Sequence, residues 1–341
     1  MKYDSIYSFF KLTLILGGIS LLSACFKEDE RIYPLPPGDQ TYFEFKESIY
    51  DFHSYFDFSA DSVTSYSSNS LWHIEFATAD SAWEVRVNSS AYYQVFPTND
   101  TAFNGITSVT DPLKYIFDAS SGNPDSCAFS GWLDRTQIPA KPTGQVFLIG
   151  QFDGIKSKPK WKIRIDEVTN SSYSITYAVF PSGSPVSVTI PKPKNVNYIQ
   201  YDLASQTEIQ IEPDRDNYDL LFTQYGTTLY DDLGVPTPYY VRGILLNPSL
   251  VEASLDTLHS FAEINYEMIK DYPFSKVRDV IGHEWKDVKV DQGNNTAEYF
   301  VNTKLNWLIK DTEGYIYKMR FIEFYNSEAV VGYTSIEFQR L

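Results

Sequence analysis

Cysteine is scarce in this chain, and its scarcity excludes several stabilising devices. Only two cysteines, Cys25 and Cys127, occur among 341 residues. They form no C-x-x-C pair and no Cys-rich cluster of the kind that holds a structural zinc ion. At most one disulfide is possible, so the folded state must be stabilised mainly by its hydrophobic core.

Basic residues are also in short supply. The chain has 28 Lys and Arg residues against 44 Asp and Glu residues, which gives a formal net charge of −16. A general nucleic-acid binder needs basic residues that displace counterions from phosphate, so the composition argues against that class. A solvated surface that keeps an extracytoplasmic protein soluble explains the charge, and an acidic functional patch is the alternative.

Common catalytic motifs are missing too. The sequence contains no G-x-S-x-G motif, no phosphate-binding loop and no G-x-G-x-x-G motif. His283 and Glu284 lack the second histidine that a zincin helix requires. The abundant carboxylates leave a glycosidase pair open by number alone, although no spacing indicates one. We therefore expect a protein that is not an enzyme.

The apolar run over residues 12–22 is too short for a membrane helix, which needs about 20 residues. Basic residues precede it, and it ends in the sequence Leu-Ser-Ala-Cys at Cys25. This order resembles a bacterial lipobox, in which the cysteine is acylated and becomes the mature N-terminus. We predict a signal peptide over 1–24 and lipid attachment at Cys25, which leaves Cys127 without a disulfide partner.

The next segment, residues 25–40, has the composition of a linker. An acidic run at 28–30 follows the lipid site and resembles the surface-export signal of lipoproteins in the Bacteroidetes. Three prolines at 34–37 make a stiff spacer. We expect an outer-membrane lipoprotein, lipid-anchored and facing the cell exterior, with one folded domain over 41–341.

Aromatic residues, in contrast, are abundant, with 26 Tyr and 23 Phe. Aromatic side chains favour strands. Within residues 71–88, Trp72, Ile74 and Phe76 alternate with more polar neighbours, and a second alternating run covers 83–88. Such alternation is typical of strands with one face in a core, so the segment predicts a β-hairpin.

A similar pattern recurs at 218–222 and 240–247, where the second run again ends in Asn. A weak internal repeat and two merely similar hairpins both explain the recurrence. The C-terminal part predicts a meander of three strands over 307–309, 315–325 and 330–338, separated by short turns.

The remaining segments complete a mostly β fold of antiparallel sheets and meander hairpins. Residues 97–142 predict mostly loop. The four prolines of 180–194 predict an edge strand or crossover, with a possible internal domain boundary near 181–196. Apolar residues at helical spacing predict one short helix near 250–272, which Pro273 ends.

Two blocks of the sequence resemble the HmuY family of haem-binding lipoproteins from the Bacteroidetes. The first block contains a Y-F-x-F-S run at 55–59, a strand that begins at Trp72 and a strand that closes on Asn88. The second block is the C-terminal meander over 307–341. The resemblance implies packed antiparallel sheets, a haem site opened by loops and work beside a TonB-dependent outer-membrane receptor.

Haem iron takes axial ligands that are usually His and sometimes Met. The resemblance implies two histidine ligands from the middle of the chain. His283, upstream of the meander, is the leading candidate ligand, followed by His259 and Met268 on the predicted helix. We expect His53 to be solvated and His73 to be an exposed strand residue.

Two functions are therefore open. The first is capture of haem or a related small ligand and its delivery to a TonB-dependent receptor. The alternative is a lipoprotein on the same scaffold that binds a protein, glycan or other nutrient without haem. Two His or Met side chains facing each other across one pocket would favour haem, whereas separately packed histidines would favour the alternative. A purely structural cell-envelope protein is a third reading.

Overall fold

The computed structural model describes residues 36–109, 115–230, 233–291, 293–294 and 296–341. The predicted signal peptide, the lipid site Cys25 and most of the predicted linker lie outside the described residues. Contacts join Pro37–Leu341 into one unit. In the described part of the chain, no helix is long and apolar enough to cross a membrane.

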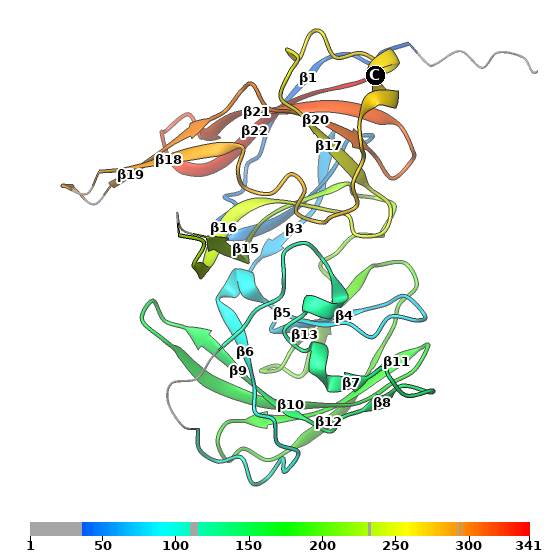
Figure 1. The fold of residues 1–341 in the computed structure, drawn as a ribbon, viewed down its shortest axis with the longest axis vertical. Coiled ribbons are helices and arrows are strands. Elements are labelled where there is room, and N and C mark those ends of the chain that lie inside the picture. The colour runs from blue at the N-terminus through cyan, green and yellow to red at the C-terminus, as the bar shows by residue number, and fades with distance from the viewer. Residues whose placement is uncertain (1–35, 110–114, 231–232, 292, 295) are drawn as a thin grey trace, which may run out of the picture. The chain divides into compact units, whose positions relative to one another are not determined.

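The middle of the chain builds two facing antiparallel sheets (Figure 1). The four-stranded β13 sheet has the order β14 (Thr207–Ile209), β13 (Tyr198–Asp202), β4 (Ile74–Ala77) and β5 (Val85–Val87). The five-stranded β10 sheet has the order β12 (Val186–Pro191), β11 (Ser172–Val179), β10 (Ser157–Val168), β9 (Val146–Phe152) and β6 (Tyr93–Pro97).

The two ends of the chain build a second pair of sheets. The four-stranded β15 sheet has the order β16 (Pro236–Leu246), β15 (Leu220–Tyr230), β2 (Phe52–Asp57) and β3 (Ser62–Ser68). The five-stranded β21 sheet has the order β1 (Thr41–Glu44), β22 (Val331–Arg340), β21 (Ile316–Tyr325), β20 (Asn306–Lys310) and β17 (Glu252–Asp256).

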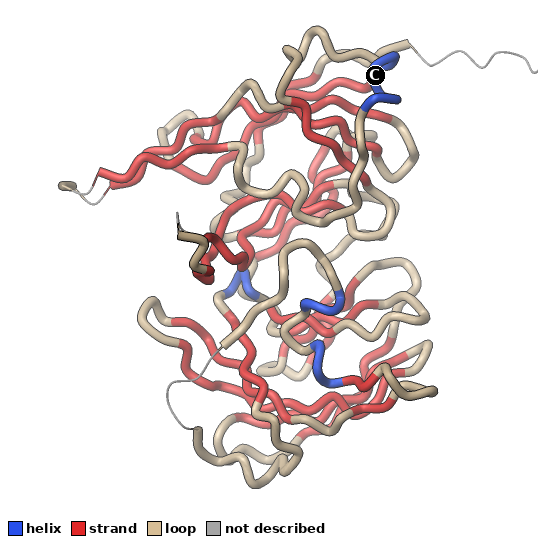
Figure 2. The backbone as a smooth tube through the Cα atoms, viewed as in Figure 1, coloured by secondary structure: helices blue, strands red, loops and turns tan. Residues whose placement is uncertain are grey.

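The remaining elements are short, and strands dominate the described chain (Figure 2). Two small ribbons are formed by β7 (Leu133–Asp134) with β8 (Lys141–Pro142) and by β18 (Lys286–Asp291) with β19 (Thr296–Val301). The helical pieces are the 3-10 helices η1 (Ser89–Ala91), η2 (Pro124–Ser126), η3 (Ser130–Trp132) and η4 (Tyr266–Asp271). The mostly β prediction is confirmed.

The chain contributes strands to the four sheets in a nested order. It begins with β1 in the β21 sheet, passes through the β15 and β13 sheets, and then completes the β10 sheet. It returns through β13 and β14, then through β15 and β16, and ends in the β21 sheet. As a result the first and last strands pair, with Thr41 opposite Phe338.

Each four-stranded sheet packs one face against its five-stranded partner. Ile74 and Phe76 of β4 enter the core shared with the β10 sheet. Leu220 and Phe222 of β15 enter the core shared with the β21 sheet. Because side chains alternate between the two faces of a strand, the residues between these positions point away from both cores.

The predicted hairpins are present. β4 pairs with β5, with Ile74 opposite Val87, and β15 pairs with β16, with Leu220 opposite Leu246. The C-terminal meander is confirmed as β20, β21 and β22. Gly314 adopts a φ of +88° in its first turn, a conformation that favours glycine.

The helix predicted over 250–272 is wrong for most of its length. Its first part is β17, which pairs along its whole length with β20. Ala253 is in the core, whereas Leu255 and Leu258, which lie on the apolar face of the predicted helix, are exposed. Long-range pairing with the meander has overridden the local periodicity. Only η4 is helical, and Asn265 caps it by accepting the Glu267 N–H at 3.1 Å.

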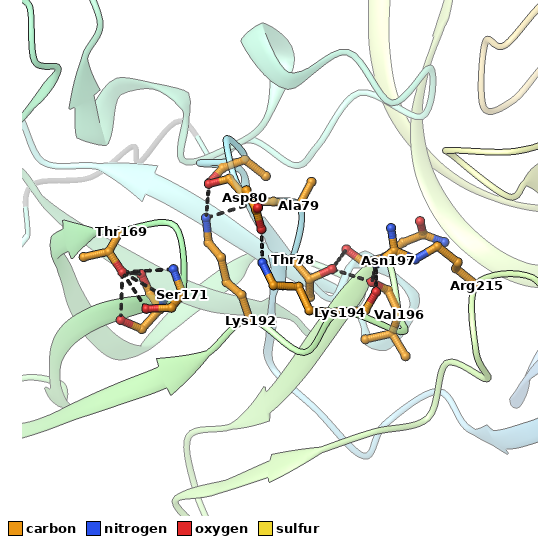
Figure 3. Close-up of polar contacts among 12 residues, drawn as sticks. Thr78, Ala79, Asp80, Thr169, Ser171, Lys192, Lys194, Val196, Asn197 and Arg215 are labelled. Atoms are coloured by element: carbon orange, nitrogen blue, oxygen red, sulfur yellow. Dashed lines mark hydrogen bonds and ion pairs between the residues drawn. The ribbon is translucent and has the colours of Figure 1, made fainter.

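β12 is an edge strand, as its prolines predicted. A lysine directly after it ties this edge to the turn between β4 and β5 (Figure 3). The buried Lys192 Nζ donates to the carbonyls of Ala79 at 3.3 Å and Ala82 at 2.5 Å. Lys194 pairs with the Asp80 carboxylate of the same turn. The contacts hold the β13 and β10 sheets together at this end.

Candidate functional site

A polar cavity lies where the second faces of the β13 and β15 sheets meet. The volume open to the centres of water molecules is about 70 Å³. Its wall includes polar residues from both sheets and from the segments between them: His53, Glu75, Arg86, Asp118, Tyr198, Gln200, Glu212, Thr223, Gln224, Tyr225 and Arg278. Most residues of the wall are buried, and five are half-buried: Ser89, Asp118, Ala119, Ser120 and Arg278.

Strand alternation explains why this wall is polar. Glu75 lies between Ile74 and Phe76, both of which enter the core, so its side chain points to the opposite face. Gln200 of β13 and Arg86 of β5 occupy the same kind of position. The polar face is not open to solvent, because the β15 sheet covers it.

His53 of β2 is buried, with 4% of its surface exposed. Its Nδ1 lies 2.8 Å from Thr223 Oγ1, and its Nε2 accepts the Trp72 indole N–H at 3.3 Å. Burial, with a contribution from the nearby Arg278 cation, lowers the pKa of His53 to about 3. His53 is therefore neutral at pH 7 with both nitrogens in use, and the prediction that it is solvated is wrong.

Glu212 follows β14 and is a buried carboxylate on the cavity wall. It accepts hydrogen bonds from the Tyr218 hydroxyl at 2.6 Å, the Asn197 amide at 2.7 Å and the Tyr198 backbone N–H at 2.7 Å. Burial nevertheless raises the pKa of Glu212 to about 7. Its charge consequently changes near neutral pH.

Asp118 and Arg86 form the next part of the wall. Asp118 accepts the backbone N–H groups of Val87 at 2.8 Å and Ala128 at 2.9 Å. Burial raises the pKa of Asp118 to about 6, and the Arg86 cation partly offsets that rise. Arg86 is 3% exposed and donates to the Glu84 carboxylate at 3.0 Å. Both charged groups therefore have partners within the protein.

Four buried atoms on this wall have no hydrogen-bond partner among the described residues. They are Arg86 Nε, Arg278 Nε, Gln200 Oε1 and the Tyr225 hydroxyl. Buried polar atoms in folded proteins are nearly always hydrogen-bonded to protein or to ordered water. Several unpaired atoms around one cavity indicate that the cavity holds water or a polar ligand.

The other histidines lie away from this cavity. His73 is buried, and its Nδ1 lies 2.8 Å from the Asp202 carboxylate, so the prediction of an exposed strand residue is wrong. His283 is half-buried beside Gly243 of β16, and burial lowers its pKa. It is not part of the cavity wall.

His259 lies in the loop after β17 and not on a helix. Its Nδ1 contacts the Asp256 carboxylate at 2.7 Å, and its side chain is 40% exposed. Met268 lies in η4, where its Sδ accepts the Asn265 amide N–H at 3.5 Å. None of the three predicted ligands, His259, Met268 and His283, lines the cavity.

The cavity does not fit haem. A volume of about 70 Å³ holds roughly five to seven water molecules, whereas a porphyrin is several times larger. Among the described residues, His53 is the one histidine on the wall, and no methionine lines it. In the described ranges, no cluster of three or more His, Cys, Asp or Glu side chains is placed to hold a metal ion.

The family profile described as HmuY protein matches residues 49–338, most of the chain. The chain belongs to the HmuY family. The family predicted from two sequence blocks is thus confirmed, and the match also includes the long middle region that those blocks leave out. No curated protein sequence matches this HmuY family member significantly.

Three solved structures resemble this HmuY family member at low identity. Apo PinO from Porphyromonas gingivitis is 8% identical, with a TM-score of 0.25 over 89% of this chain and 97% of PinO. A Bacteroides vulgatus protein described as HmuY-like and haem-binding is 16% identical, with a TM-score of 0.18 over 41% of this chain and 82% of its own. A Bacteroides fragilis protein described as a lipoprotein is 13% identical, with a TM-score of 0.18 and the same two coverages.

Sequence reasoning missed the cavity of this HmuY family member. Glu75, Arg86 and Gln200 stand at polar positions of alternating strands, where a solvated face is the ordinary interpretation. Arg278 lies in a segment without any periodic pattern. The similar hairpins at 71–88 and 218–247 were the one available signal, since they contribute opposite walls.

Proposed function

We propose that this HmuY family member is an outer-membrane lipoprotein that captures a small polar molecule in the cavity between the β13 and β15 sheets. The captured molecule is then delivered to a TonB-dependent receptor. The main observation that supports the proposal is that four buried polar atoms on one cavity wall have no hydrogen-bond partner. Preformed sites for small ligands have this character, with a few polar groups that converge on an enclosed space.

The membrane location rests on the sequence. The lipobox at Cys25 supplies the anchor, and the acidic run at 28–30 supports export to the cell surface. The proline-rich spacer would hold the folded part away from the membrane.

Delivery requires a surface that contacts the receptor. The β18–β19 ribbon carries exposed apolar side chains, with Val288 and Val290 together on one face and Phe300 on the other. Exposed apolar groups that are gathered on one surface commonly mark a protein contact. This ribbon supports the receptor part of the proposal. Replacing Val288 and Val290 by Asp should abolish co-purification with the receptor and leave ligand capture unchanged.

The capture proposal is tested by finding what the protein carries. The natural lipoprotein is extracted in detergent, and its bound small molecules are identified by mass spectrometry. Leu245→Trp fills the cavity, whereas Leu250→Trp makes the same change at an exposed site outside it. We expect a polar compound in the wild type and in Leu250→Trp but not in Leu245→Trp.

The smaller substitution Ser90→Leu, also on the wall, repeats the test if Leu245→Trp does not fold. Retention of the same compound by a folded, cavity-filled variant would overturn the proposal. So would the absence of any retained compound in the wild type.

Haem capture is the second candidate function, and one observation favours it. Asp256 holds His259 Nδ1 at 2.7 Å, which leaves Nε2 free on a partly exposed ring. A carboxylate that orients a histidine in this way is typical of the surroundings of metal-ligating histidines. If this chain binds haem, His259 is the residue best oriented to hold its iron.

A further inference from the structure

Arg278 stands apart from the other charged residues of the cavity. Its backbone is fixed on both sides, because its N–H donates to the Ser121 carbonyl at 3.0 Å and its carbonyl accepts the Leu246 N–H at 2.7 Å. Its guanidinium carbon lies 5.3 Å from the centroid of the Tyr198 ring. The side chain is therefore held against the cavity wall.

The Arg278 guanidinium has no counterion within the described part of the chain. No carboxylate oxygen there lies within 4.0 Å of it, and its side chain donates no hydrogen bond to a described residue. Arg86 and Arg320, by contrast, pair with Glu84 at 3.0 Å and Glu337 at 2.6 Å. Arg278 as a whole is half-buried, but its Nε is buried and unpaired, and a buried unpaired donor of a cationic side chain on a cavity wall indicates a missing anion.

The carboxylates of the cavity do not supply that anion, because each already accepts hydrogen bonds from other groups. Glu75 accepts the Gln200 amide N–H at 3.1 Å. Asp118 accepts two backbone N–H groups, and Glu212 accepts three donors. None of them forms an ion pair with Arg278, although Glu75 is near enough to favour its charged form.

The other unpaired atoms define what else a ligand would meet. Arg86 Nε is a second unused donor, and the Tyr225 hydroxyl can donate or accept. Gln200 Oε1 is an unused acceptor whose residue is 1% exposed. The free groups thus match a molecule that carries both an oxyanion and a hydroxyl or amino donor.

From these contacts we infer that the cavity binds a small carboxylic acid, or another small oxyanion, whose charged oxygens pair with Arg278 and whose donor group meets Gln200. The inference rests on the proposed function, since it names the ligand class of the same cavity. The volume limits the ligand to about the size of five to seven water molecules, as in a short hydroxy or amino acid.

The test uses the detergent-extracted lipoprotein and isothermal titration calorimetry. The probes are acetate, lactate and glycine, with sulfate as an inorganic oxyanion and lactamide as a neutral analogue of lactate. We expect at least one carboxylate to bind, and we expect the amide to bind at least about thirtyfold more weakly than lactate. Preference for sulfate over all carboxylates would identify an inorganic oxyanion as the ligand.

Arg278→Met should weaken carboxylate binding by about thirtyfold or more, and Arg278→Lys should have a smaller effect because it keeps the charge. A saturating carboxylate should raise the urea midpoint of the wild type but not that of Arg278→Met, because only the wild type binds it. A merely structural arginine would leave this ligand-dependent shift unchanged. Arg320→Met is the matched control, because Arg320 pairs with Glu337 away from the cavity and should not affect binding.

The possible failures are distinct. If lactamide binds as well as lactate, or if Arg278→Met binds carboxylates normally, the anion assignment is wrong although the cavity still holds a polar molecule. If no carboxylate and no sulfate binds while a compound sensitive to Leu245→Trp is retained, the ligand is neutral and the assignment is again wrong. If nothing is retained, the proposed function itself fails.

Discussion

Asn88 and Asn247 hold equivalent positions in two different sheets. The Asn88 side-chain amide donates to the Trp72 carbonyl at 2.9 Å, and the Asn247 amide donates to the Tyr218 carbonyl at 2.9 Å. The Asn88 backbone N–H donates to the His73 carbonyl and the Asn247 backbone N–H donates to the Asp219 carbonyl, both at 2.9 Å. His73 and Asp219 directly precede β4 and β15. Each asparagine thus closes its hairpin by the same pair of bonds.

This correspondence favours an internal repeat over two merely similar hairpins. Each hairpin also belongs to a four-stranded sheet that packs against a five-stranded sheet. The two sheet pairs therefore share their architecture as well as their closing asparagine.

The asparagine bonds predict a loss of stability on substitution. Both amides are fully buried, and their Oδ1 atoms also accept backbone N–H groups, one at Asn88 and two at Asn247. Asn88→Ala and Asn247→Ala should each lower the free energy of unfolding by about 2–4 kcal/mol, measured by urea titration. Asn195→Ala, at an exposed site, should change it by less than about 0.5 kcal/mol. A wild-type midpoint in either buried variant would contradict the assignment.

Haemin titration distinguishes the two candidate functions. Because the cavity is small and His53 is fully bonded, we expect only the broad absorbance of adsorbed haemin. Replacing His259, His283 or Met268 by Ala should leave that spectrum unchanged. A sharp Soret band that is lost in His259→Ala would establish haem ligation and favour the second candidate function.

The buried His53 predicts loss of stability in acid. Its pKa is about 3 in the folded state, against about 6.5 in the unfolded chain. Between these values the unfolded chain binds a proton that the folded state does not, so stability falls as the pH drops from about 6.5 towards 3. Relative to pH 7, the loss from this residue at pH 5 is on the order of 2 kcal/mol.

His53→Gln should remove this part of the pH dependence. The raised pKa values of Asp118 and Glu212 act in the opposite direction, but both groups remain in the variant. The difference between the two stability curves therefore isolates His53. Parallel curves for the wild type and His53→Gln between pH 7 and pH 5 would show that this account is wrong.

Carboxylate binding should weaken as the pH rises from 6 to 8. The groups that surround Arg278 in the cavity are Glu75, Arg86, Asp118, Tyr198, Glu212 and the neutral His53. The pKa values of about 6 for Asp118 and about 7 for Glu212 allow these two acids to take up protons when an anion enters. Affinity should fall roughly tenfold over this range, as calorimetry at each pH would measure.

Glu212→Gln should remove most of that pH dependence, because it replaces the acid with the higher pKa by a neutral amide. Binding that strengthens with pH in the wild type, or an unchanged slope in Glu212→Gln, would rule out linked proton uptake.

Local pattern determined much of the architecture. Alternation at Ile74 and Phe76 sufficed to predict a strand with one face in a core, because strand geometry sends successive side chains to opposite faces. Trp72 of the same run lies on the cavity wall instead. The C-terminal meander followed from the same rule together with turn chemistry at Gly314. The lipobox at Cys25 and the HmuY resemblance likewise needed no tertiary information.

The β17 strand shows where local pattern fails. Apolar residues over 250–272 recur at a spacing that suits a helix, yet the first part pairs with β20. That choice depends on backbone hydrogen bonds to residues about fifty positions away, which no local window contains.

Only the tertiary structure determines that a cavity forms at this place. The sequence determined that Glu75, Arg86 and Gln200 share the polar faces of strands, and water is the usual neighbour of such a face. Packing of the β15 sheet against this face buried it instead and brought Arg278 to its edge. Whether a polar strand face is solvated or forms a site depends on what covers it, and here the covering strands are distant in sequence.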